Sequence, residues 1–141
     1  MASRKIKDLC VELQPKCKAF LAACEEQITD AAVIIVCTFR DGVEQNRLYA
    51  QGRTTPGMII TNAKAGESAH NKTLADGTPA AEAFDYGVIV DGKYDAGGTH
   101  PAWIKAGQIA MQLGLEWYGA PGSKFKEKPH CQLPQTHSQM H

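Results

Sequence analysis

The chain has 141 residues, which predicts a single domain because domains typically take about 100–200 residues. Its 15 basic and 15 acidic residues balance to a net charge of zero, so we expect neither a nucleic acid nor an anionic lipid surface as its main partner. The longest apolar run, Ala31 to Cys37, is far shorter than the roughly 20 residues that span a bilayer. We therefore expect no membrane insertion.

The amino terminus and the cysteines bear on the cellular compartment. Residues 1–5 carry positive charge, but no apolar stretch with a small-residue cleavage site follows them. We therefore expect no secretory signal and synthesis in the cytoplasm. The five cysteines are an odd number without a C-x-x-C spacing, which argues against a disulfide framework. We expect reduced thiols that are buried in the core.

Two helices are predicted near the amino terminus. Pro15 suits the first turn of a helix, and apolar residues after it recur at steps of three and four, as on one face of an amphipathic helix. A shorter helix is expected before it, over Ser3 to Leu13. The apolar face that we expect to pack in the core comprises Cys17, Phe20, Leu21, Cys24 and Ile28.

The middle of the chain combines short strands, a helix and a long loop. Ala31 to Phe39 is dense in β-branched residues and predicts a buried strand. Val43 to Gln51 predicts a short helix that Gly52 closes. Met58 to Thr61 is a candidate short strand. Residues 62–80 are rich in Ala, Gly, Asn, Asp and Thr, which indicates a loop.

The second half of the chain predicts two further strands and a helix. Ala83 to Val90 indicates a strand, Ala102 to Leu113 has helical periodicity, and Pro129 to Leu133 is expected to form a last strand. Residues 134–141 are typical of a loose tail. Short strands interspersed with helices favour an α+β fold, here a small single domain with a short antiparallel sheet flanked by helices.

Two histidines and a carboxylate in separate segments could form a metal site. His70 lies in a loop before a strand, Asp85 opens that strand, and His130 lies near the carboxyl terminus. Such a set gives zinc three protein ligands and leaves a fourth position for water, whose pKa the ion lowers to about 7. Glu127 could then take a proton as a general base, and Arg40 could stabilise an oxyanion.

A series of short motifs occurs in a fixed order. The motifs are Thr38-Phe-Arg40, Glu44-Gln45, Leu48-Tyr-Ala-Gln-Gly-Arg53, Ser68-Ala-His70, Ala83-Phe-Asp85, Leu115-Glu-Trp117 and Glu127-Lys-Pro-His130. Together they resemble the zinc peptidases that include D-alanyl-D-alanine carboxypeptidases and phage L-alanyl-D-glutamate endopeptidases. The resemblance covers about residues 13–133, the core of an expected single peptidase domain over 1–141. The segment 48–53 is most similar to the phage endolysin branch.

The resemblance implies a small α+β domain with zinc in a cleft on an antiparallel sheet. It also implies hydrolysis of an amide in the peptide stem of bacterial peptidoglycan. The implied ligands of Zn²⁺ are His70, Asp85 and His130. Glu127 would be the general base and Arg40 the residue that stabilises the carbonyl and the transition state. The residues that would bind substrate or shape its site are Gln45, Ser68 and Trp117.

The carboxylate ligand departs from the family's motif. The family places this Asp seven residues after the first histidine, where this chain has Gly77, whereas Asp85 follows His70 by fifteen residues. An eight-residue insertion explains the difference. The apolar strand after Asp85 favours it over Asp76, the nearest competitor, and over Glu82.

Each implied role also has a purely structural interpretation. Arg40 could form a surface ion pair with a neighbouring acid, Trp117 could pack in the core, Ser68 could cap a turn, and Glu127 could be a solvated charge among lysines. The lengthened loop 71–82 could act as a lid. The residues outside the motifs that we expect not to bind the metal are His100, His137, His141 and Cys131.

The favoured function is a zinc-dependent L-alanyl-D-glutamate endopeptidase that acts as a phage endolysin in host lysis. With no secretory signal expected, it would reach the periplasmic cell wall through a holin-type pore protein, and we expect a monomer. One alternative is a D-alanyl-D-alanine carboxypeptidase, which needs a site closed around a free carboxylate. Another is a non-catalytic, zinc-containing module that binds wall peptides. A metal-free scaffold domain is a third.

Overall fold

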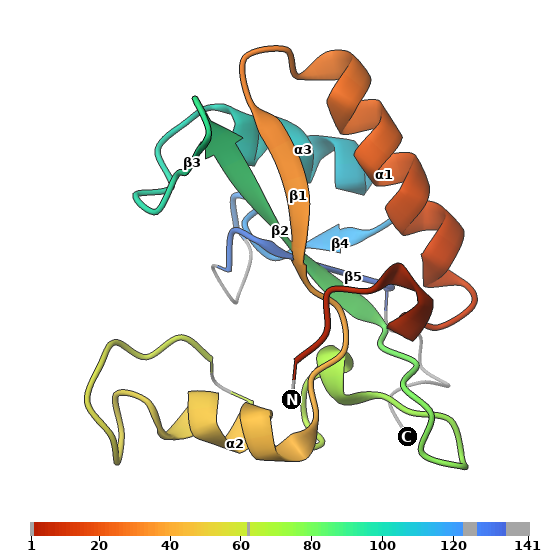
Figure 1. The fold of residues 1–141 in the computed structure, drawn as a ribbon, viewed down its shortest axis with the longest axis vertical. Helices are drawn as coiled ribbons and strands as arrows, with labels where there is room; N and C mark the ends of the chain where they lie inside the picture. Colours follow the sequence, from red (N-terminus) through yellow and green to blue (C-terminus); the bar gives the residue numbers. More distant parts are fainter. Residues whose placement is uncertain (1, 62, 123–126, 135–141) are drawn as a thin grey trace.

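The computed structural model describes residues 2–61, 63–122 and 127–134. The helical elements are η1 (Ile6–Asp8), α1 (Leu13–Gln27), α2 (Gly42–Ala50), η2 (Ala69–Asn71) and α3 (Ala102–Gln112). The strands are β1 (Ala32–Cys37), β2 (Ala83–Val90), β3 (Lys93–Tyr94), β4 (Glu116–Trp117) and β5 (His130–Gln132). They form an antiparallel sheet in the order β1-β2-β5-β4, with β3 paired to β2 (Figure 1). The predicted α+β fold is confirmed.

The two faces of the sheet differ because side chains alternate along each strand. Phe84, Tyr86 and Val88 of β2 are buried against helices α1 and α3. The ring of Phe20 lies 5.1 Å from that of Phe84 and 5.5 Å from that of Tyr86. The Tyr86 hydroxyl donates to the backbone oxygen of Trp103 on α3 at 2.6 Å. The helices cover this apolar face, which leaves the opposite face for polar groups.

The strand register places those polar groups side by side. Asp85 on β2 is the partner of His130 on β5, and Gln132 lies two residues further along on the same face. On the other side of β2, the register shifts between Ile35 and Cys37, so that Cys37 becomes the partner of Asp85. Such an irregularity bends a strand and re-aims the side chain at its end. Asp85 therefore has a neighbour from each flanking strand.

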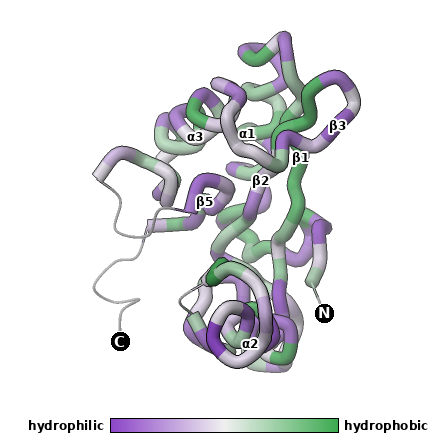
Figure 2. The backbone as a smooth tube through the Cα atoms, turned by 90° about the vertical axis from the view of Figure 1, so that its left-hand side faces the viewer, coloured by the Kyte–Doolittle hydropathy of each residue, from purple (hydrophilic) through white to green (hydrophobic). Residues whose placement is uncertain are grey.

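Helix α2 belongs to a lobe that faces the polar side of the sheet. It begins after Asp41, whose carboxylate accepts the backbone N–H of Glu44 at 2.9 Å. The chain reverses soon after the helix at Gly52, where φ is 82° and a glycine is favoured. Figure 1 shows α2 apart from α1 and α3, and Figure 2 shows its mixed hydropathy in contrast to the mostly hydrophobic β1.

The amino-terminal helix prediction needs correction. The expected helix over 3–13 is reduced to the short η1, because the segment instead joins the rest of the fold through backbone bonds. Ser3 donates its backbone N–H to Phe39 at 2.7 Å, and Cys10 donates to Ala81 at 2.9 Å. Helix α1 itself begins at Leu13, so Pro15 does lie in its first turn, as predicted.

The strand predicted over 58–61 is wrong. Backbone oxygens of this segment accept hydrogen bonds from side chains instead of from a neighbouring strand. The side chain of Gln51 donates to the backbone oxygen of Met58 at 3.0 Å, and that of Arg53 donates to the backbone oxygen of Thr61 at 3.1 Å. Of the predicted tail, residues 135–141 lie outside the described residues, and so do His137 and His141. Within the described part of the chain, none of the helices is long and apolar enough to cross a membrane.

The cysteines are free thiols. Cys17, Cys24, Cys37 and Cys131 are buried, as predicted, whereas Cys10 is half-buried. Burial raises the pKa of Cys17 and of Cys24 to about 12, which keeps these thiols protonated and unreactive.

Candidate metal centre and its cleft

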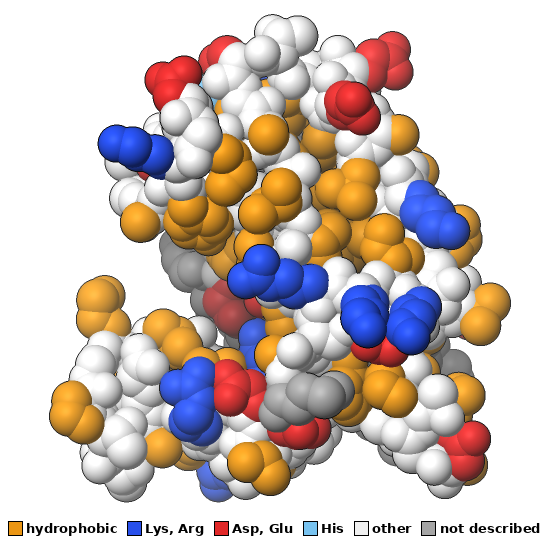
Figure 3. All heavy atoms as spheres, in the orientation of Figure 1, with side chains coloured by type: hydrophobic (Ala, Val, Ile, Leu, Met, Phe, Trp, Pro, Cys, Tyr) orange, Lys and Arg blue, Asp and Glu red, His pale blue; other side chains and the backbone are white. Residues whose placement is uncertain are grey.

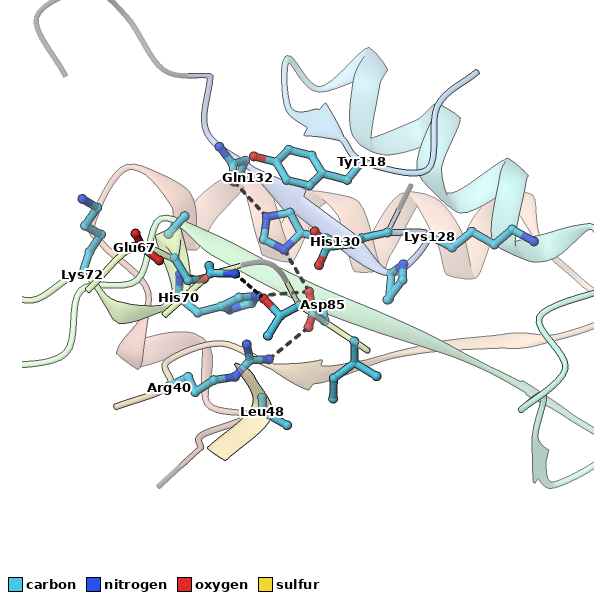
Figure 4. A pocket seen from close by; sticks show the side chains of 17 residues that line it. Arg40, Leu48, Glu67, His70, Lys72, Asp85, Tyr118, Lys128, His130 and Gln132 are labelled. Carbon is cyan, nitrogen blue, oxygen red and sulfur yellow. Dashed lines mark hydrogen bonds and ion pairs between the residues drawn. The ribbon is translucent and has the colours of Figure 1, made fainter. Parts of the chain in front are cut away.

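Two imidazoles and a carboxylate converge on the polar face of the sheet (Figure 4). The Oδ1 atom of Asp85 lies 3.1 Å from Nε2 of His70 and 3.2 Å from Nδ1 of His130. The two histidine rings lie 5.0 Å apart and are inclined at 77°. His70 comes from η2, Asp85 from β2 and His130 from β5. The structure thus brings together the three side chains that the family resemblance implies as ligands.

In each histidine ring, the nitrogen that faces away from Asp85 is hydrogen-bonded to an oxygen acceptor. His70 Nδ1 donates to the backbone oxygen of Thr38 at 2.8 Å, and His130 Nε2 donates to Oε1 of Gln132 at 2.8 Å. These bonds direct the lone pairs of the other nitrogens toward Asp85, as the outer partners of metal-binding histidines do. Two imidazole nitrogens and one carboxylate form a common zinc ligand set. The residues therefore fit a zinc ion.

Ser68 fixes the turn that presents His70. Its hydroxyl accepts the backbone N–H of His70 at 3.1 Å, and the side chain of Asn71 accepts the backbone N–H of Ser68 at 3.1 Å. The two bonds form a capping box around η2. The backbone oxygen of His70 also accepts the N–H of Arg40 at 2.9 Å. Ser68 lines the cleft as well, so capping and contact with a substrate are compatible.

Arg40 lies between the three converging side chains and helix α2. Its Nη1 donates to Oε1 of the buried Gln45 at 3.0 Å, and Gln45 donates in turn to the backbone oxygen of Ala63 at 2.7 Å. Its Nη2 lies 3.6 Å from Oδ2 of Asp85. Gln45, expected to bind substrate, does not line the cleft. It holds Arg40 in place instead.

A thiol adjoins the same cluster. The Sγ atom of Cys37 lies 3.8 Å from Nδ1 of His70 and 3.6 Å from Nη2 of Arg40. Ligand atoms of Cys37, His70 and Asp85 all lie within 4.8 Å of one another. His70 turns its Nδ1 edge toward the thiol, and that nitrogen is bonded to Thr38. The set that includes His130 therefore fits a catalytic ion better than the set that includes Cys37.

Burial and opposite charge act against each other at this centre. Burial alone would raise the pKa of Asp85, but the charge of His70 and the hydrogen bonds from both histidines hold that pKa well below its usual range. Burial alone would lower the pKa of His70, but the charge of Asp85 and its hydrogen bond outweigh burial and raise it to about 10. Without a metal ion, a proton on His70 neutralises the carboxylate.

We expect the affinity for zinc to rise with pH, because zinc must displace this proton. At pH values below the raised pKa of His70, a rise of one pH unit should increase the apparent association constant for zinc by up to about tenfold, if one proton is displaced. Calorimetry in buffers of different ionisation enthalpy measures the proton release, and a His70→Gln variant should lose it. A zinc affinity that stays constant between about pH 6 and 8 would contradict this account.

Glu127 lines the cleft beside the histidines. A turn places it there: the N–H of Glu127 donates to the backbone oxygen of Tyr118 at 3.2 Å, and the N–H of His130 donates to that of Glu127 at 3.2 Å. Burial raises the pKa of the Glu127 carboxyl; the charge of His130 opposes this shift and that of Asp85 adds to it. A carboxyl with a raised pKa is suited to exchanging protons near neutral pH.

The centre lies at the base of a cleft of about 760 Å³. One wall carries the apolar side chains of Leu48 on α2 and Ile60 on the loop that follows, and the other carries Tyr118 and Lys128. Figure 3 shows the hollow between the α2 lobe and the rest of the molecule. Figure 4 shows Lys72 and Lys128 on opposite sides of the centre. The cleft thus combines apolar walls with charged groups.

Trp117, expected to wall the site, lies in the core instead. It is the strand partner of Cys131, whose side chain is buried on the helical face, and its Nε1 donates to the backbone oxygen of Lys128 at 2.6 Å. Alternation along the chain directs the next residue, Tyr118, toward the cleft. The aromatic side chain at the site is therefore that of Tyr118.

The insertion after His70 lies mostly outside the cleft. The carboxylate of Asp76 accepts the backbone N–H of Thr78 within the loop at 3.0 Å, so the structure places Asp85 and not Asp76 against the histidines. Of the loop 71–82, Lys72 alone lines the cleft among the residues that the structure describes. The lid hypothesis for this loop has little geometric support.

Two partners of the histidines were not predicted. Gln132 follows His130 by two residues in a strand, so period-two alternation could have indicated it. The Thr38 contact is made by a backbone oxygen, which no side-chain pattern reports.

Replacing Gln132 by Leu is expected to weaken zinc binding by about 10–100-fold, because His130 loses the acceptor that fixes its tautomer. Gln132→Glu keeps an acceptor oxygen and should restore most of the affinity. Competition with a chromophoric chelator measures both. Equal affinity in the Leu variant and the wild type would show that Gln132 does not position His130.

The peptidoglycan L-alanyl-D-glutamate endopeptidase CwlK of Bacillus subtilis (strain 168) is similar to this chain. The two are 40% identical over 102 residues, which cover 72% of this chain and 60% of CwlK. The matched segment thus spans less than two thirds of the relative's length. No family model matches the chain. The identity nonetheless confirms the resemblance of the ordered motifs to the peptidase family that includes this L-alanyl-D-glutamate endopeptidase.

Proposed function

We propose that the chain is a zinc-dependent peptidase that cuts the L-alanyl-D-glutamate amide in the peptide stem of peptidoglycan. The observation that carries the proposal is the convergence of His70, Asp85 and His130 at the base of a cleft that Glu127 and Arg40 also line. The activity of CwlK supports peptidoglycan as the substrate class.

The chain's own residues prepare the site for the ion. His70, Asp85 and His130 would hold zinc, and Thr38 and Gln132 keep the imidazoles in the required tautomers. When bound, zinc supplies Lewis-acid activation of water and of the scissile carbonyl.

Glu127 and Arg40 would perform the proton transfer and the charge stabilisation. The Glu127 carboxylate takes a proton from the attacking water as the new C–O bond forms, and then gives a proton to the amine as the C–N bond breaks. Arg40 stabilises the negative charge that develops on the carbonyl oxygen. The bond that the guanidinium donates to Gln45 fixes it before substrate arrives, so little reorganisation is needed.

The shape of the cleft favours an endopeptidase. An internal amide needs room for peptide on both sides of the reacting carbonyl, and the cleft extends from Lys72 past the centre to Lys128. Leu48, Ile60 and Tyr118 offer apolar contacts along it. Much of a peptide's surface can be buried in a cleft of this size.

Mass spectrometry of defined stem peptides tests the choice of bond. The proposal predicts fragments with a new amino-terminal glutamate. If only terminal D-alanine is lost, the protein is a D-alanyl-D-alanine carboxypeptidase instead. If the zinc-loaded protein binds stem peptides but does not cut them, it is a wall-peptide binding module instead.

The proposed biological setting is host lysis by a bacteriophage. The segment Leu48 to Arg53 resembles the endolysin branch, which supports this setting. The protein would act as a monomer on the periplasmic cell wall, with access through a holin-type pore protein. Expression in a Gram-negative host with and without such a pore protein tests this, and lysis should require both proteins.

A further inference from the structure

Cys37 and Asp85 both approach the guanidinium of Arg40. Nη2 of Arg40 lies 3.6 Å from Sγ of Cys37 and 3.6 Å from Oδ2 of Asp85. Asp85 turns its other oxygen, Oδ1, toward the two histidines. One carboxylate therefore faces two cation positions, and the arginine group fills the second.

The thiol is placed by the fold and has no role in the proposed hydrolysis. The register shift at the end of β1 makes Cys37 the partner of Asp85, and this residue is 6% exposed. Arg40 lines the cleft, whereas Cys37 does not. The guanidinium must therefore move before an ion from the cleft can reach the sulfur.

The donor atoms around this position suit a soft divalent ion. Ligand atoms of Cys37 and Asp85 lie within 4.8 Å of each other, and Sγ of Cys37 and Oδ2 of Asp85 each lie 3.6 Å from Nη2 of Arg40. Nδ1 of His70 is bonded to Thr38 and is not a donor here. Thiolates select soft metals, whereas a lone carboxylate does not. An ion bound here would meet a thiolate and a carboxylate oxygen that the catalytic set leaves free.

We propose that Cys37 and Asp85 form a second, inhibitory cation site, for which a thiophilic divalent ion competes with the guanidinium of Arg40. On binding, the thiol releases its proton to solvent and a metal–sulfur bond forms. Arg40 is displaced and no longer stabilises the carbonyl oxygen, so hydrolysis stops. The inhibitory consequence rests on the proposed function, but the binding site itself does not.

Cadmium is the probe, because a cadmium–thiolate bond has its own ultraviolet charge-transfer absorption. Zinc-loaded protein is titrated with Cd²⁺ while elemental analysis follows the zinc that stays bound. Wild type should gain the thiolate band with zinc retained. In Cys37→Ser the band should vanish, and Cd²⁺ should bind and inhibit at least about tenfold more weakly. Cys10→Ser, which alters the half-buried thiol, should behave as wild type.

The Arg40→Ala variant keeps Cys37 and should change Cd²⁺ binding in the opposite direction. Removing the competing guanidinium should strengthen Cd²⁺ binding by about tenfold or more. The direction distinguishes competition from general damage to the site, which would weaken binding. Cys37→Ala serves if the serine variant does not fold, with zinc content and cleavage by the variant as controls.

Three results would overturn the proposal. These are an undiminished thiolate band in Cys37→Ser, weaker or unchanged Cd²⁺ binding in Arg40→Ala, and release of one zinc per cadmium without a thiolate band. The last would mean that cadmium merely replaces the catalytic ion. Failure of the proposed function gives a different result: the zinc-loaded wild-type protein would cut no stem peptide even before cadmium is added.

Discussion

Replacing Glu127 by Gln is expected to lower the turnover of peptidoglycan stem peptides by about 10²–10⁴-fold. Gln has nearly the same size but cannot accept the proton of the attacking water or pass it to the leaving amine. Zinc content and thermal unfolding should stay close to wild type, because the Glu127 side chain is not among the three residues that converge as ligands. Steady-state kinetics on a defined stem peptide provides the measurement.

Glu67→Gln is the matched control. Glu67 also lines the cleft, but its carboxylate accepts the backbone N–H of Lys64 at 2.6 Å and it is exposed. The control should retain its rate within a few-fold, which separates loss of a general base from loss of one negative charge in the cleft. Equal losses in both variants, or an active Glu127→Gln protein, would remove Glu127 from the mechanism.

Replacing His130 by Ala should abolish cleavage and weaken zinc binding by more than the 10–100-fold typical of an outer partner. The change removes one of the three converging side chains that would hold zinc and leaves Asp85 bonded to His70 alone among the histidines. Zinc content after dialysis and the residual cleavage rate are the two readouts.

His100→Asn controls for the loss of any histidine. His100 lies outside the centre, where its Nδ1 accepts the backbone N–H of Ala102 at the start of α3 and its Nε2 lies 3.4 Å from Asp30. Asparagine can cap a helix as well, so fold, zinc and activity should be kept. Zinc retained by His130→Ala at wild-type affinity would exclude His130 as a ligand.

The core of the site follows from patterns that a sequence carries directly. Asp85 lies near the start of β2 between the buried Phe84 and Tyr86, and this alternation indicates the face on which its carboxylate lies. The ordered motifs then imply His70 and His130 as its companions, and the structure places all three together. Long, strongly patterned elements such as β2 are the ones that a sequence predicts best.

Features that depend on pairing between short elements could not be predicted. Strand β4 has two residues, so only its partner Cys131 decides that Trp117 enters the core and that Tyr118 lines the cleft. The contact of Cys37 with Arg40 arises from a register shift that no periodicity reports. The bond that Arg40 donates to Gln45 likewise joins the segment after β1 to helix α2.

The dependence of cleavage on zinc is best measured by removing the metal and adding it back. The protein is stripped of metal with a strong chelator, dialysed, and assayed for new amino-terminal glutamate on purified Gram-negative peptidoglycan while zinc is added stepwise. We expect no cleavage without metal and a rate that rises to a plateau at one zinc per chain, with no such rise in His130→Ala. Full cleavage by the stripped protein, or equal restoration of the His130→Ala variant, would contradict this expectation.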